Sequence, residues 1–97
     1  MLKMVMVVYN EALDDEVMEI LQVGETKNYT KITGVYGKGS GSGTHMGDDI
    51  WPGLNNILYV ACSDTQAKEI SLRVRELRKK FVKEGIKAFI LPVEEIS

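Results

Sequence analysis

The feature that most constrains this chain is the order in which two kinds of apolar pattern follow one another. Four short runs rich in Val, Ile, Tyr and Thr are typical of β-strands, and two longer stretches carry apolar residues at steps of three and four, as amphipathic helices do. The order is strand, helix, strand, strand, helix, strand. It predicts an α+β, ferredoxin-like βαββαβ fold, in which two helices cover one face of a four-stranded antiparallel sheet.

Local signals place the ends of the two helices. Asp14 is expected to cap the first helix, because a carboxylate can accept hydrogen bonds from the first backbone amides. Gly24 is expected to end it. Ser63 and Gln66 have the spacing of a capping box at the start of the second helix. Gly85 is expected to end that helix.

The strand patterns indicate that both faces of the sheet are apolar and that each has to be covered. The first, third and fourth runs are apolar on both faces, and the helices can cover only one of them. We therefore expect the open face to be an interface between copies of the chain, with simple solvation of that face as the alternative. Pro92 is expected to mark an edge strand or a strand end. The expected strands are Leu2–Tyr9, Tyr29–Tyr36, Asn56–Cys62 and Ile86–Val93.

Length and composition narrow the classes of protein. The 97 residues are expected to form one domain over 1–97, and 44% hydrophobic with 27% charged residues is too apolar for disorder. No apolar run reaches the roughly 18 to 20 residues that span a bilayer, so no membrane insertion is expected. A net charge of −2 gives no electrostatic reason to expect nucleic acid. The lone Cys62 predicts a reducing, cytoplasmic location.

The connection between the second and third strands carries most of the functional information. It runs over 38–54, about three times the usual two to five residues of a hairpin loop. Seven of the nine glycines fall between positions 34 and 53, and His45 and Trp51 are the only residues of their types. Long loops of this kind are functional or disordered. We expect a flexible loop that becomes ordered on a ligand or a partner, with a plain flexible hairpin tip as the alternative.

Two kinds of ligand are compatible with this connection. Glycine amides can approach an anion closely, and Lys38 between Gly37 and Gly39 adds positive charge, although the spacing matches neither the Walker A nor the dinucleotide-binding motif. His45 with Asp48 and Asp49 offers nitrogen and oxygen ligands to a divalent metal, a site that needs further carboxylates or a neighbouring subunit.

The same residues give little support to catalysis. One His and one Cys with no carboxylate to orient them do not make a nucleophile and base pair. Cys62 falls inside a strand pattern and is expected in the core. The protein is therefore not expected to be an enzyme.

Three stretches of the chain resemble the PII signal-transduction (nitrogen regulatory protein P-II) family. The first is Leu-Asp-Asp at 13–15 together with 29–37, the second is Gly-Lys-Gly at 37–39 leading to Gly-Thr-His at 43–45, and the third is 89–95. The resemblance implies a homotrimer with its sheets facing inward and small effectors, typically adenine nucleotides (ATP, ADP or AMP), bound between subunits. It also implies that 38–54, as a T-loop, docks onto a transporter, an enzyme or a regulator.

This resemblance assigns candidate roles to individual residues. The anionic ligand is expected between subunits, and the loop residues are expected to contact the target or to gate the cleft. The cleft candidates are Gly37, Lys38, Gly39 and Lys87, and the loop candidates are His45, Asp48, Asp49 and Trp51.

Departures from the family pattern predict a divergent PII-like protein. Gly39 stands where the family has the T-loop glutamine, and no tyrosine lies between Gly37 and Asn56 for uridylylation. The family's nucleotide-binding B-loop is reduced to residues 83–87, where only Lys87 matches the family's lysine. The family's C-terminal basic loop has no counterpart in the sequence up to Ser97. The first rival hypothesis is a metal-binding trimer of CutA-like architecture that uses His45 with Asp48 or Asp49. A second is a structural oligomer with a passive loop.

Overall fold

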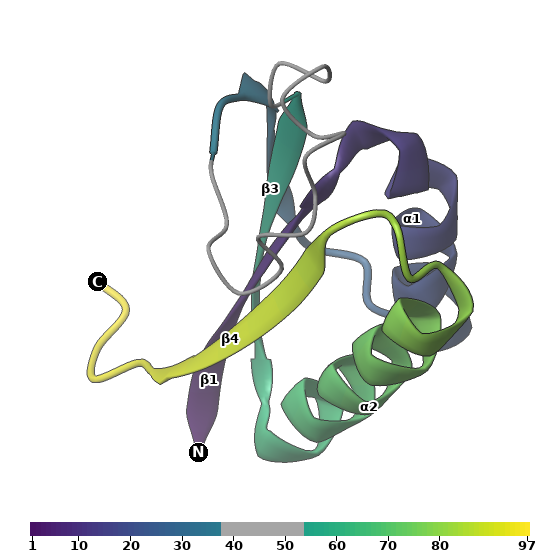
Figure 1. The fold of residues 1–97 in the computed structure, drawn as a ribbon. Helices are drawn as coiled ribbons and strands as arrows, with labels where there is room; N and C mark the ends of the chain where they lie inside the picture. The colour runs from purple at the N-terminus through teal and green to yellow at the C-terminus, as the bar shows by residue number, and fades with distance from the viewer. Residues whose placement is uncertain (38–53) are drawn as a thin grey trace.

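The computed structural model describes residues 1–37 and 54–97, and its elements follow the predicted βαββαβ order (Figure 1). A short 3-10 turn, η1, which the sequence analysis did not anticipate, separates the first strand from the first helix. Six of the eight strand ends differ from the predicted ones by one residue, and the other two agree with the prediction. The elements are β1 (Leu2–Asn10), η1 (Glu11–Leu13), α1 (Asp14–Val23), β2 (Thr30–Val35), β3 (Asn55–Ser63), α2 (Asp64–Lys80) and β4 (Ile86–Pro92).

The four strands form one antiparallel sheet in the order β2-β3-β1-β4. The central strand β1 pairs over most of its length with both neighbours, so that Val7 lies opposite Leu58 on β3 and Ala88 on β4. The β2–β3 register shifts between Ile32 and Val35, where Gly34 has a φ of +67°. Pro92 is the last residue of the edge strand β4, as predicted.

Both helices lie on the same side of the sheet, where they cover one face (Figure 1). Because side chains alternate along a strand, every second residue of β1 and β3 points into this layer. The apolar residues at steps of three and four on the helices complete the core, and Cys62 belongs to it as predicted. The buried core residues are Val5, Val7, Tyr9, Leu13, Val17, Ile20, Leu21, Leu58, Val60, Cys62, Ala67, Ile70, Val74 and Ile86.

The other face of the sheet, here called the open face, is also apolar. The register places Met6 between Tyr59 of β3 and Phe89 of β4, and the next row joins Ala61, Met4 and Leu91. Phe89 is 45% exposed and Leu91 is 43% exposed, although both are large and apolar. The predicted two-sided apolar pattern is therefore present. The apolar side chains named as the open face are those of Met4, Met6, Val8, Ile32, Ile57, Tyr59, Ala61, Phe89 and Leu91, and Lys87, opposite Val8, lies on the same face.

The helix starts confirm one predicted cap and correct the other. Ser63 and Gln66 form the capping box, with both reciprocal bonds to the backbone present. The prediction for Asp14 was wrong, because the α1 N-cap is Leu13, which makes no side-chain cap bond. A cap instead belongs to Asn10, whose side-chain oxygen accepts a 2.8 Å hydrogen bond from the amide of Ala12 and starts η1.

The helix ends also differ in part from prediction. α1 ends before Gly24 as expected, but Glu25 takes the left-handed backbone (φ +57°). The amide of Glu25 donates to the carbonyl of Gln22 at 3.1 Å, and the amide of Thr26 donates to the carbonyl of Leu21 at 2.8 Å. These two hydrogen bonds form a Schellman motif. α2 does not extend to Gly85. It ends at Lys80, and residues 81–85 form the turn that leads into β4.

Candidate functional site

The described residues contain only part of the predicted site. Gly37 and Lys87 are placed, whereas Lys38, Gly39, His45, Asp48, Asp49 and Trp51 lie outside the described residues. Gly37 follows β2 and lies close to the start of β3, since a Cβ on Gly37 would meet the Asn55 side-chain nitrogen at 3.1 Å. Lys87 lies in β4 opposite Val8, and it is exposed.

Gly37 and Lys87 belong to opposite edges of the sheet. Gly37 follows the edge strand β2, Lys87 lies in the edge strand β4, and β3 and β1 lie between them. Three strand spacings amount to roughly 14 Å. The strand pairing of one chain therefore does not bring the two predicted ligand residues together.

A polar cluster that the sequence analysis missed lies at the same end of the sheet. The Asp14 carboxylate accepts hydrogen bonds from the Tyr9 hydroxyl (2.6 Å), the Asn56 side-chain amide (3.2 Å) and the Lys31 ammonium (3.0 and 3.1 Å). These groups come from β1, β3 and β2, so that the first residue of α1 is tied to three strands. Tyr9 and Asn56 are buried, at 1% and 5% exposure.

The electrostatics of this cluster follow from burial and from its hydrogen bonds. Burial alone would raise the pKa of Asp14, but the hydrogen bonds from Tyr9 and Lys31 and the charge of Lys31 outweigh it and lower that pKa below 3.8. Burial, and next the hydrogen bond to Asp14, raise the pKa of the Tyr9 hydroxyl far above its ordinary value of 10.0. The cluster is therefore a neutral phenol that donates to an ionised carboxylate at neutral pH.

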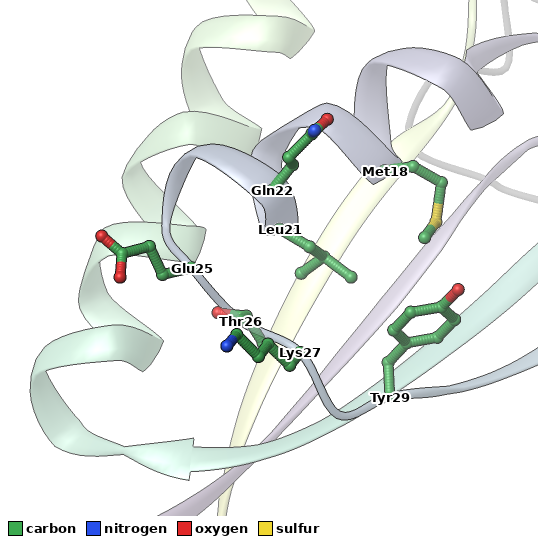
Figure 2. A pocket seen from close by; sticks show the side chains of 7 residues that line it. All are labelled: Met18, Leu21, Gln22, Glu25, Thr26, Lys27 and Tyr29. Atoms are coloured by element: carbon green, nitrogen blue, oxygen red, sulfur yellow. The ribbon is translucent and has the colours of Figure 1, made fainter.

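An open hollow lies toward the other end of β2, between the end of α1 and the segment that enters the strand (Figure 2). Its volume is about 420 Å³. Met18, Leu21 and Tyr29 give it an apolar lining, and polar side chains complete its border. A neighbouring hollow of about 250 Å³ shares Glu25, Thr26 and Lys27 with it. The sequence analysis did not predict either hollow, since they depend on how α1 ends.

The described residues give no support to metal binding or nucleophilic chemistry. No group of three or more His, Cys, Asp or Glu residues in 1–37 and 54–97 could hold a metal ion. Burial raises the pKa of the Cys62 thiol, which favours the unreactive protonated form. Within the same ranges, no helix has the length and apolar character needed to cross a bilayer.

A family model described as nitrogen regulatory protein P-II matches residues 2–97, which is almost the whole chain. No curated protein was found to match.

Solved structures give the same result at the level of fold. A PII-like signaling protein from Thermus thermophilus is 26% identical, with a TM-score of 0.66 over 92% of this chain and 83% of that one. CPII, a nitrogen regulatory PII-like protein from Thiomonas intermedia K12 bound to ADP, AMP and bicarbonate, is 16% identical, with a TM-score of 0.68 over 93% and 84%. The apo form of CPII is 11% identical, with a TM-score of 0.66 over 95% and 90%.

Proposed function

Since the chain belongs to the nitrogen regulatory protein P-II family, we propose that it is a PII-like regulatory protein that works as a homotrimer. In this proposal it binds a small anionic effector between its subunits and acts on a protein target through 38–54. It transmits a binding event and catalyses no reaction.

The open face is the observation that carries the proposal. Its apolar side chains come from all four strands, and large ones such as Phe89 and Leu91 are more than two-fifths exposed in a single chain. A surface of this kind is typical of a subunit interface. Three copies that turn their open faces inward would bury it, and each chain would then have a second core of apolar residues.

Cyclic symmetry also explains where the ligand residues lie. In a closed ring of three identical chains, each contact joins two different surfaces of the chain, and we propose that these surfaces are the β2 edge of one chain and the β4 edge of the next. This contact would bring Gly37 of one chain toward Lys87 of its neighbour. The effector cleft would then exist only in the trimer, with Lys38 and Gly39 adjoining Gly37 in sequence.

The chemistry of these residues favours a phosphate-bearing effector. Glycine amides and a lysine ammonium are the groups that bind phosphate oxygens. CPII, which has the same fold, is bound to ADP and AMP. We therefore propose an adenine nucleotide (ATP, ADP or AMP) as the effector. Bicarbonate, which CPII also binds, is the second anion to test.

The proposed target is a protein that contacts the loop 38–54. His45, Asp48, Asp49 and Trp51 offer it aromatic and charged side chains. The target class would be a transporter, an enzyme or a regulator. A location in the reducing cytoplasm is part of the proposal, and it is supported by a single, buried Cys62 that has no second cysteine in the chain to pair with.

Isothermal titration with ADP, AMP and ATP, with and without magnesium and bicarbonate, tests the effector. We expect saturable binding that Lys87→Ala weakens about 10- to 100-fold, the cost of one charge-assisted hydrogen bond. Lys79→Ala is the matched control, because it removes the same charge from an exposed position on α2. Equal nucleotide affinity in the wild type and in Lys87→Ala would contradict the cleft. Titration with zinc tests the rival hypothesis of metal at His45, Asp48 and Asp49.

A further inference from the structure

The two helices carry opposite charge, although they pack against each other in one layer over the sheet (Figure 1). α1 has four acidic residues and no basic one, whereas α2 has six basic residues and three acidic ones. The chain as a whole has a net charge of only −2. Acidic and basic residues are therefore separated within the helix layer, to an extent that the composition of the whole chain does not show.

The side of each helix that faces away from the core carries a row of exposed residues at helical spacing. On α1, two acidic residues and Val23, which is 55% exposed, follow one another at steps of four. On α2, Leu72, which is 50% exposed, and two basic residues follow at steps of three and four. Residues at these steps share one side of a helix. We call the first row the acidic stripe and the second the basic stripe; they are Asp15, Glu19 and Val23, and Leu72, Arg75 and Lys79.

The topology makes the two stripes run in opposite directions. α1 reverses the direction of β1, α2 reverses that of β3, and these two strands are antiparallel. The Asn10 amide donates to the Gly85 carbonyl at 2.9 Å, so the start of α1 and the end of α2 lie at one end of the molecule. At the other end, Glu25 and Gln66 line the same hollow. The charged ends of both stripes therefore lie at the same end of the helix layer, and their apolar residues lie further along it.

A two-fold rotation makes this layer complementary to itself. An axis that runs along the helices, between two layers stacked face to face, places α1 of each copy over α2 of the other. Both stripes hold their two charges four residues apart, roughly 6 Å along the helix axis, so two acidic groups meet two basic groups in register. The opposed pairs are Asp15 with Lys79, Glu19 with Arg75, and Val23 with Leu72.

The charges of the stripes are not paired within one chain. None of the ion pairs among residues 1–37 and 54–97 includes a residue of either stripe, and none joins α1 to α2. A single exposed ion pair contributes little to stability, but several charges in register favour a partner with the complementary arrangement. The ion pairs among these residues are Lys31–Asp14, Arg73–Glu69 and Lys3–Asp64.

We propose that the helix layer is a contact surface for a second copy of the chain, in which the acidic stripe of each copy lies on the basic stripe of the other. A uniformly anionic partner fits this layer less well, because the acidic stripe lies beside the basic one. The inference goes beyond the proposed function and uses neither the open face nor the effector cleft. Three chains that turn their open faces inward would leave their helix layers outside, so this contact would join one trimer to another.

Charge reversals in the two stripes test this geometry. In Arg75→Glu or in Glu19→Arg alone, both symmetry-related pairs become like-charged, and we expect association to weaken about 10-fold or more. In an equimolar mixture of the two variants, each of these pairs again joins an arginine to a glutamate, and association should return to within about threefold of the wild type. Recovery in the mixture also shows that both variants are folded. Lys27→Glu is the matched control, because it reverses one positive charge at an exposed position outside both stripes.

Sedimentation equilibrium of the full chain at about 0.01 M and about 1 M salt measures the association, because the Debye length falls from about 30 Å to about 3 Å. For the wild type and Lys27→Glu we expect about twice the mass or more at the lower salt concentration. The inference would be overturned by a wild-type mass that does not change with salt, or by association of Arg75→Glu equal to that of the wild type. A mixture of the two reversed variants that stays dissociated would also overturn it, as would an equal loss in Lys27→Glu.

The mass at about 1 M salt separates this inference from the proposed trimer. At that salt concentration the charged stripes are screened, and the open face is the apolar surface that can still hold chains together. A single chain at high salt whose mass doubles at low salt would contradict the trimer and support the helix-layer contact. A trimer at both salt concentrations would support the open face and overturn the helix-layer contact.

Discussion

The two faces of the sheet are built from the same strands, but their side chains differ in how far they are buried. On the helix-covered face, Val5, Val7, Leu58 and Val60 are at most 1% exposed, whereas Phe89 on the open face is 45% exposed. The alternation along each strand sends apolar side chains to both sides, but two helices can cover only one. The comparison shows that the covered face is satisfied within one chain. The open face is left exposed by one chain, and we propose that two further copies cover it.

The polar residues of the covered face support the same contrast. Tyr9 and Asn56 are buried on that face, and both donate to Asp14. No buried side-chain nitrogen or oxygen among the described residues lacks a hydrogen-bond partner. The covered face is thus complete in its polar as well as its apolar groups.

The largest effect is expected from truncating one residue on each face. Leu58→Ala should lower the free energy of unfolding by about 2–5 kcal/mol, because Leu58 is fully buried and its truncation leaves a cavity. Tyr59→Ala, its neighbour on the open face, should instead weaken association of the chains. Urea unfolding at several protein concentrations distinguishes the two. If Tyr59→Ala lowered the free energy of unfolding by a large amount at every protein concentration, the proposed difference between the two faces would be contradicted.

A smaller effect is expected from the polar cluster. Asp14→Ala leaves the buried Tyr9 hydroxyl and Asn56 amide without their acceptor, which should cost about 1–3 kcal/mol of unfolding free energy. The control Asp15→Ala, at an exposed position, should stay within about 0.5 kcal/mol of the wild type. Equal losses in both variants would show that the helix dipole, and not the cluster, is responsible.

The same cluster predicts a pH dependence. The pKa of Asp14 is lowered in the folded chain from its ordinary 3.8, so the unfolded chain binds the proton first as the pH falls. The stabilisation by Asp14 is then complete above that ordinary value and is lost as the pH drops through the lowered, folded pKa. The difference in stability between the wild type and Asp14→Ala should therefore shrink only below about pH 4.

The smallest effect concerns the end of the covering helix layer. Glu25→Gly should raise the free energy of unfolding by about 0.5–1 kcal/mol, because relief of the left-handed strain exceeds the added entropy of glycine in the unfolded chain. Glu19→Gly, inside α1, should lower it by about 1 kcal/mol. Thermal unfolding of the two variants measures both signs. A destabilising Glu25→Gly would indicate that the Glu25 side chain contributes contacts of its own.

The parts of the fold that were predicted depend on short-range patterns. The capping box of Ser63 and Gln66, the alternation of the strands and the order of the elements need only a few neighbouring residues, and all are present. Asp14 was misinterpreted as a cap because its partners Lys31 and Asn56 are 17 and 42 residues away. No local pattern connects residues at such separations. The left-handed Glu25 was missed because the adjacent Gly24 is the residue that ordinarily takes this role.

The candidate site was predicted less completely, for a related reason. Gly37 and Lys87 were expected to share a ligand between subunits, which stays a prediction. The strand order puts them on opposite edges of one sheet, which a sequence pattern cannot show.

The mass of the protein in solution tests the central claim most directly. Sedimentation equilibrium of the wild type and of Met6→Glu, which puts a charge in the middle of the open face, compares the association state before and after disruption. The account predicts a wild type of three times the 10.9 kDa chain mass and a Met6→Glu variant that has the mass of one folded chain. A wild type that sediments as a single chain at all concentrations would contradict it, as would a Met6→Glu trimer as stable as the wild type.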